Sequence, residues 1–125
     1  MKFAKWVYRT VGIYGLVVLA PLLFLERAVS QTSPPAITHP EYYYGFAIVG
    51  VAWQVAFLVI SNDPQRFRPL MPVTWLEKTW GFIAIILYVQ NRISSEVLVL
   101  GLIDLLFAAF FVSTYITTTQ SWVHS

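Results

Sequence analysis

The chain has 125 residues, of which 58% are hydrophobic and 11% are charged, and its formal net charge is +2. This composition is too apolar for a soluble globular domain of that length, so charged residues must be confined to chain ends and loops. The few cations form no basic patch, which argues against a nucleic-acid partner. The absence of cysteine excludes thiol redox chemistry and iron–sulfur clusters. We therefore expect an integral membrane protein that acts in the lipid bilayer or at its surface.

The first membrane-spanning helix is predicted at residues 6–25. The N-terminal stretch resembles a secretory signal peptide, because Lys2 and Lys5 precede an apolar core and small residues at 28–30 form a cleavage pattern. The charged Glu26 lies close before that pattern and disfavours cleavage. We expect the segment to be retained as a helix.

A proline-rich segment at residues 26–41 follows and is predicted to be a loop. Pro40 suits the first turn of the next helix, since its missing N–H would have no partner there. The second helix is predicted at residues 41–61. Gln54 is its only strongly polar interior residue, which makes it a candidate for an interhelical contact.

A short basic loop with Arg66 and Arg68 is predicted next, and both side chains are expected to contact anionic lipid headgroups. The third helix is predicted at residues 73–91. Thr74 and Glu77 have the spacing of a capping box, so both are expected at the start of this helix in a structural role.

The fourth helix is predicted at residues 97–117, with Ser94 or Ser95 available as its N-cap. The short connection predicts that the third and fourth helices are antiparallel neighbours. Asp104 is the carboxylate that lies well inside this apolar run.

Together the elements predict an all-α fold, a four-helix transmembrane bundle with up-down-up-down topology that forms one integral membrane domain at residues 1–125. Positively charged loops are retained in the cytoplasm. The cations expected on the cytoplasmic side are Lys2, Lys5, Arg9, Arg66, Arg68 and Lys78. Since only Arg27 and Arg92 oppose them, both termini are expected to be cytoplasmic, in the bacterial inner membrane.

One face of each predicted helix carries small or polar residues at three- and four-residue steps, which predicts the faces that pack in the bundle interior. These faces are Tyr8, Gly12, Gly15 and Leu19; Ala47, Gly50, Gln54 and Phe57; Glu77, Gly81, Ala84, Tyr88 and Asn91; and Gly101, Asp104, Ala108, Phe111 and Tyr115.

Asp104 is the main candidate for a functional site. It is expected about 12 Å inside its helix, at nearly the depth of Gln54 in the second helix. A charged, unpaired carboxylate at this depth costs several kcal/mol, and no Lys, Arg or His is expected at its level. We therefore expect Asp104 to be neutral, or solvated by a polar cavity, and to hydrogen-bond with Gln54, Trp53 or Tyr88. These four residues form the predicted ligand or proton site.

Three interpretations of that site stay open. The first is a non-enzymatic binding or accessory protein, which holds an apolar small molecule or a partner helix around Gln54 and Asp104. The second is a small proton-coupled transporter or channel subunit that uses Asp104, in a homodimer. The third is a hydrogen bond that only fixes helix packing. No enzyme, catalytic residue, metal site or cofactor is predicted, because no nucleophile is paired with a base and His39 with Glu41 offers too few metal ligands.

The segment from Tyr42 to about Leu106 resembles a family of small uncharacterised bacterial membrane proteins, on the runs YYGFAIVGVAWQVAF, RFRPLMPVTWLEK and GLIDLL. This resemblance implies four helices in a membrane and brings no activity. In topology the chain is also similar to sterol-isomerase-like, sigma-2-receptor-like and DoxX-like bundles. Ligand-binding acids of the sterol-isomerase-like group lie on early helices, whereas Asp104 lies on the fourth, so no site residue is carried over.

Overall fold

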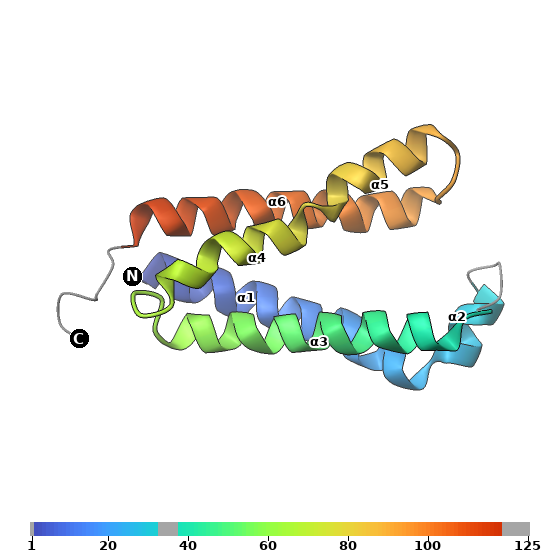
Figure 1. The fold of residues 1–125 in the computed structure, drawn as a ribbon, viewed down its shortest axis with the longest axis horizontal. Helices are drawn as coiled ribbons and strands as arrows, with labels where there is room; N and C mark the ends of the chain where they lie inside the picture. The colour runs from blue at the N-terminus through green and yellow to red at the C-terminus, as the bar shows by residue number, and fades with distance from the viewer. Residues whose placement is uncertain (1, 33–37, 119–125) are drawn as a thin grey trace. The chain divides into compact units, whose positions relative to one another are not determined.

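The computed structural model describes residues 2–32 and 38–118, and these segments form helices and no strand. The helices are α1 (Lys2–Leu19), η1 (Ala20–Phe24), α2 (Glu26–Thr32), α3 (Pro40–Asn62), η2 (Arg68–Leu70), α4 (Met71–Lys78), α5 (Trp80–Val89) and α6 (Ser95–Thr117) (Figure 1). Two of them, η1 and η2, are short 3₁₀ helices. The predicted all-α fold class is confirmed.

Among the residues that the structure describes, four helical segments are long and apolar enough to cross a membrane. They are Lys2–Phe24, Pro40–Asn62, Arg68–Val89 and Ser95–Thr117. Each has 22 or 23 residues, so each is about 33 Å long and matches a hydrocarbon core about 30 Å thick. The prediction of four membrane-length helices is therefore confirmed. The up-down-up-down topology, the cytoplasmic termini and the identity of the membrane stay predictions.

The segment between the first two spans contains a helix that the sequence did not predict. Residues Glu26–Thr32 form α2, although residues 26–41 were expected to be a loop. The helix ends before Pro34 and Pro35, which lie outside the described residues. The second span begins at Pro40, as predicted, with proline in its first turn.

The third span begins at Arg68, five residues before the start predicted at residue 73. Pro69 and Pro72 each occupy the first turn of a helix, where the missing proline N–H costs nothing. Thr74 consequently lies inside α4, and its hydroxyl donates to a backbone carbonyl three residues earlier. The predicted capping box at this position is wrong.

The third span is also interrupted, because Thr79 separates α4 from α5. The Thr79 backbone N–H and its hydroxyl both donate to the carbonyl of Leu76, at 3.1 and 2.7 Å. A threonine hydroxyl bonded back to the preceding turn competes with the regular helical ladder and bends the helix. The sequence therefore places a bend near the middle of this span.

The described chain forms two compact units, Tyr8–Val59 and the remaining described residues, here called the C-terminal unit. Within the first unit α1 packs against α3. A Cβ on Gly15 would collide with the side chain of Gln54, and a Cβ on Gly50 would meet Leu19 Cδ1 at 2.8 Å. Later residues of α1 thus meet earlier residues of α3, so the two helices are antiparallel. Buried members of the two predicted faces are Tyr8, Gly12, Gly15, Ala47, Gly50, Gln54 and Phe57.

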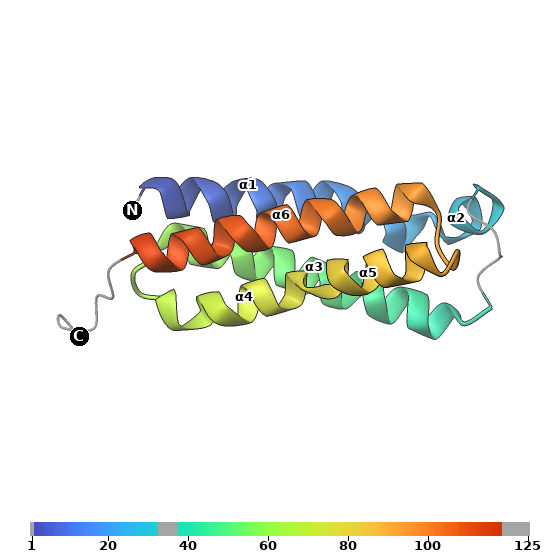
Figure 2. The ribbon, with the colours of Figure 1, turned by 90° about the horizontal axis from the view of Figure 1, so that it is seen from above.

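In the C-terminal unit, α5 approaches α6 closely where glycine faces glycine. A Cβ on Gly81 would collide with the backbone carbonyl oxygen of Gly101, and a Cβ on Gly101 would lie 2.7 Å from Ala84 Cβ. Figure 2 shows α4 and α5 running along α6. Small residues are needed here because the two backbones pack against each other.

A short turn joins α5 to α6 and makes them antiparallel neighbours, as predicted. Asn91 has a left-handed backbone with φ of 59°, and the next N–H donates to the carbonyl of Leu87 at 2.8 Å. This is the bonding pattern of a Schellman motif, whose left-handed position is most often glycine and next most often asparagine. The Ser94 hydroxyl then accepts from the N–H of Val97, so the predicted N-cap of the fourth helix is confirmed.

Arg68 ties the start of the third span to the end of α6. Its Nε donates to the Tyr115 carbonyl at 3.1 Å, and its guanidinium lies 3.7 Å from the centre of the Tyr115 ring. Trp75 packs edge-on against the same ring. The Arg68 guanidinium, which was expected to contact lipid headgroups, thus contacts Tyr115 instead. The Arg66 side chain is exposed. Headgroup binding by either arginine stays a prediction.

Arg68→Lys is expected to lower the free energy of unfolding by about 1 kcal/mol, because an ammonium cannot stack on the tyrosine ring as a planar guanidinium does. Denaturant unfolding in detergent micelles measures the change, with Arg66→Lys as the control. Equal stability of Arg68→Lys and the wild type would show that the stacked contact contributes nothing.

Candidate functional site

The C-terminal unit contains an ion pair between two of the helical segments that are long and apolar enough to cross a membrane. Lys78 Nζ, at the end of α4, lies 3.3 Å from Asp104 Oδ1 on α6. The lysine side chain is only 5% exposed and the aspartate 18% exposed. Removal of both charges from water makes this a buried pair, in which loss of either partner costs far more than at a surface.

A second carboxylate contacts the same lysine. Glu77 Oε2 lies 3.5 Å from Lys78 Nζ, which is within ion-pair distance. This buried oxygen accepts no hydrogen bond from the described residues. We call these three residues the Glu77–Lys78–Asp104 cluster. With all groups ionised it carries two negative charges and one positive charge, so one negative charge is left without compensation.

Trp80 completes the surroundings of Asp104. Its indole Nε1–H donates to Asp104 Oδ2, while Lys78 donates to the other oxygen. Both carboxylate oxygens of Asp104 therefore accept a hydrogen bond, one from each of these two side chains. Within the described part of the chain, by contrast, no donor forms a hydrogen bond with the buried oxygen of Glu77.

The cluster lies near the middle of the spans that carry it. Lys78 is about 15 Å along the helix from Arg68, and Asp104 is about 14 Å from Ser95, at 1.5 Å per residue. The bend at Thr79 follows directly after Lys78. Charged groups, a helix interruption and mid-span depth thus coincide in one place.

The prediction that no cation lies at the level of Asp104 is wrong. It rested on a third helix that began at residue 73, which placed Lys78 near the cytoplasmic interface. Because the span begins at Arg68, Lys78 lies about five residues, or roughly 7 Å, deeper in the span than predicted. Trp80, the second partner of Asp104, was not predicted either.

The other predicted site residues have separate surroundings. Gln54 is buried in the Tyr8–Val59 unit, where its Nε2 donates to the carbonyl of Gly50 at 3.1 Å. Its Oε1 is buried over Gly15 without a hydrogen bond among the described residues. Trp53 packs beside Phe57 with ring centres 6.2 Å apart. A shared site of Gln54 or Trp53 with Asp104 stays a prediction.

Tyr88 belongs to the C-terminal unit with Asp104, but its side chain is 42% exposed. Trp80, rather than Tyr88, supplies the aromatic donor to the carboxylate. Gly81 and Ala84, on the same predicted face, are buried against α6. The predicted packing face is therefore confirmed near the cluster, whereas its part toward the end of α5 is exposed.

The chemistry available to the cluster is proton and ion binding. Among residues 2–32 and 38–118, no three His, Cys, Asp or Glu side chains group in a way that could hold a metal ion. Comparison of the chain with models of protein families, with curated proteins and with solved structures finds no match. The family resemblance and the topological similarities stay predictions.

Proposed function

We propose that the chain is a small proton-coupled transporter or channel subunit of a membrane, in which the Glu77–Lys78–Asp104 cluster binds one proton. The observation that supports this proposal is the charge of the cluster, two carboxylates around one buried ammonium. An uncompensated negative charge at mid-span is costly. One bound proton makes the cluster neutral.

Glu77 is the acid that takes up this proton in the proposed mechanism. Asp104 receives hydrogen bonds from Lys78 and Trp80 on its two oxygens and acts as the fixed counter-ion of the lysine. Glu77 is 24% exposed, so it keeps some access to water for proton exchange. This assignment revises the sequence-based interpretation, which gave the proton to Asp104.

The bend at Thr79 supports a role in transport rather than in packing alone. Interrupted helices whose break lies near the bilayer midplane are a recurrent feature of ion and proton sites in transporters. A change in the charge of Glu77 alters the attraction within the cluster at the very point where α4 and α5 meet. Protonation is thereby linked to the geometry of the bend.

The competing interpretation is that the Lys78–Asp104 pair only fixes α4 against α6. The distance of 3.3 Å between Lys78 Nζ and Asp104 Oδ1 favours it, since such a pair specifies how two helices align. It leaves Glu77 without a role, however, because a lysine and one aspartate would already be neutral.

Proton uptake into vesicles tests the proposal. Wild-type protein in liposomes with an enclosed pH dye is expected to take up protons under an imposed membrane potential, and Glu77→Gln and Asp104→Asn are each expected to reduce uptake to the level of empty liposomes. Both substitutions make the cluster neutral without a proton. Glu96→Gln, at the first turn of α6, is the matched control and should behave as the wild type. Wild-type uptake no faster than that of empty liposomes would contradict the proposal and favour the packing interpretation.

A further inference from the structure

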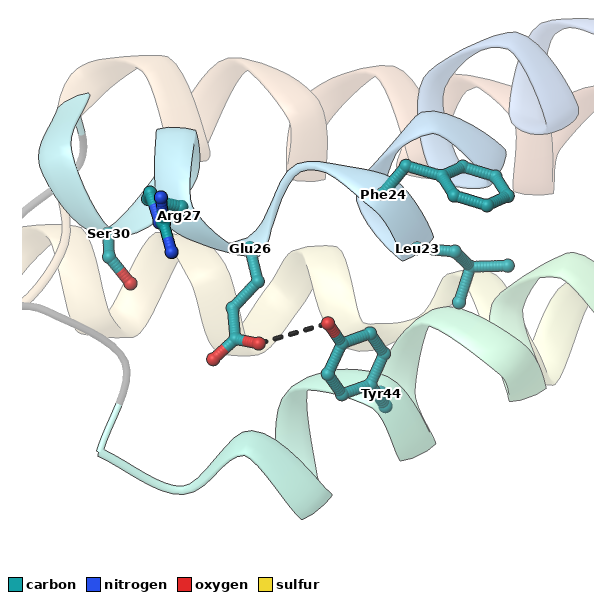
Figure 3. Close-up of a pocket in the computed structure, with 6 residues that line it drawn as sticks. All are labelled: Leu23, Phe24, Glu26, Arg27, Ser30 and Tyr44. Atoms are coloured by element: carbon teal, nitrogen blue, oxygen red, sulfur yellow. Dashed lines mark hydrogen bonds between the residues drawn. The ribbon is translucent and has the colours of Figure 1, made fainter.

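A second feature of the molecule lies far along the chain from the cluster, in the Tyr8–Val59 unit. It is a pocket of about 520 Å³ where η1, α2 and α3 meet (Figure 3). This volume is within the range of roughly 300–1,000 Å³ that is usual for small-molecule sites. The pocket is lined by Leu23, Phe24, Glu26, Arg27, Ser30 and Tyr44.

The pocket is located at the end of a membrane span. The first span ends at Phe24 and α2 begins at Glu26, so the lining residues pass from apolar to charged within three positions. Phe24 is 84% exposed. Tyr44, on the opposite wall, belongs to the first turns of the second span. This is the level at which lipid headgroups meet the acyl region, and amphipathic rings favour it.

The acidic side of the pocket is held in place by hydrogen bonds. The Tyr44 hydroxyl donates to Glu26 Oε1 at 2.9 Å, as the dashed line in Figure 3 shows. The neighbouring Tyr43 hydroxyl donates to the Leu22 carbonyl and anchors α3 to η1. One oxygen of the Glu26 carboxylate is thus occupied, and the other is left to accept from a ligand.

The basic side of the pocket is Arg27. Within the described part of the chain this guanidinium has no ion-pair partner, although it follows Glu26 directly in sequence and lines the same pocket. A guanidinium offers paired N–H donors that match phosphate or carboxylate oxygens. A guanidinium that can bind an anion and a carboxylate that can bind a cation therefore lie side by side on α2.

From this arrangement we infer that the pocket binds a zwitterion with a primary ammonium and a phosphate, the chemistry of an ethanolamine phospholipid headgroup. Glu26 receives the ammonium and Arg27 the phosphate. Leu23 and Phe24 lie toward the span and contact the first atoms of an acyl chain. A primary ammonium fits better than a quaternary one, since it can donate a hydrogen bond to the free oxygen of Glu26. The inference does not depend on the proposed proton site.

The test counts lipids that remain bound to the full-length protein, by native mass spectrometry after reconstitution in phosphatidylcholine nanodiscs. One sample contains phosphatidylethanolamine as a minor lipid, another contains phosphatidylglycerol, which has the phosphate without the ammonium. Phosphatidylethanolamine is expected to bind more tightly. Glu26→Gln should reduce its affinity about tenfold and leave phosphatidylglycerol unchanged, because only the contact with the ammonium is lost.

Two further variants and a control complete the test. Arg27→Gln should weaken both lipids about tenfold, since both carry the phosphate. Tyr44→Phe removes the hydrogen bond that holds Glu26 in place and should weaken the binding of phosphatidylethanolamine only. It serves as a second variant if Glu26→Gln fails to fold. Glu41→Gln, an exposed carboxylate beside His39, is the control and should bind as the wild type.

A third sample separates a lipid from a soluble ligand. Soluble glycerophosphoethanolamine carries the same headgroup without acyl chains. If it displaces phosphatidylethanolamine at equal concentration, the site serves a soluble zwitterion; if it fails to do so, the site serves the lipid. Equal affinity of the wild type for the two lipids, or an unchanged preference in both Glu26→Gln and Tyr44→Phe, would overturn the inference.

Discussion

Lys78→Met is expected to lower the free energy of unfolding by about 3 kcal/mol at neutral pH. The methionine fills a similar volume but leaves Glu77 and Asp104 near each other without a cation. Removal of one partner from a buried ion pair costs about 3–5 kcal/mol, and the lower end applies here because both carboxylates are partly exposed.

The pH dependence of this variant has a definite sign. Without Lys78 both acids must bind protons to be accommodated in the fold, whereas in the unfolded chain they are ionised at neutral pH. The folded variant then holds more protons than the unfolded variant, so its stability rises as the pH falls. Denaturant unfolding in detergent at pH 5 and pH 8 would measure both effects.

Lys5→Met is the matched control for that experiment. Lys5 is exposed on α1, and loss of an exposed charge changes stability by less than about 0.5 kcal/mol. If Lys78→Met were as stable as Lys5→Met at neutral pH, the lysine would not be compensating a buried negative charge.

Gly81→Ala is the second substitution with a large expected effect, a loss of about 2 kcal/mol. The added Cβ would collide with the carbonyl oxygen of Gly101, a backbone atom that cannot rotate away, and would also meet Leu105 Cγ at 2.6 Å. Overpacking of this kind costs about 1–3 kcal/mol. The α5 and α6 backbones would have to separate beside the cluster.

Gly45→Ala provides a control with the opposite sign. A Cβ at Gly45 would have no atom within 4 Å, and alanine is favoured over glycine inside a helix by about 0.5–1 kcal/mol. Unfolding midpoints of the two variants should therefore move in opposite directions. A stabilised Gly81→Ala variant would show that α5 and α6 do not approach as closely as the structure has them.

The packing faces were predictable from the sequence because small residues recur at helical spacing. Gly12, Gly15 and Gly50 lie in the α1–α3 contact, and Gly81 and Gly101 lie between α5 and α6. At these positions a side chain would keep the helices apart, so the pattern of small residues marks the contact surface directly.

The partner of Asp104 could not be found in the same way, because the start of the third span was misplaced. Pro69 and Pro72 were interpreted as loop residues, but both occupy first helical turns. The preference of proline for this position was the available signal. An earlier start would have placed Lys78 at the depth of Asp104 and changed the interpretation of this acid from a neutral group to a counter-ion.

The pocket was missed for a related reason. Its acidic and basic groups lie on α2, in a segment whose downstream prolines predicted a loop throughout. Glu26 was considered only for its effect on a cleavage site, and Arg27 only for the orientation of the termini. Adjacent charges just beyond a membrane span, followed by residues able to form two helical turns, were the signal for a surface helix.

Infrared spectroscopy of the purified protein tests the central proposal most directly, because a protonated carboxyl group has a C=O stretching band separate from that of a carboxylate. At neutral pH the wild type should show the band of one protonated carboxyl group. Glu77→Gln and Asp104→Asn should each abolish it, and Lys78→Met should increase it to two. Absence of the band in the wild type, or its persistence in both Glu77→Gln and Asp104→Asn, would contradict a proton bound at the cluster.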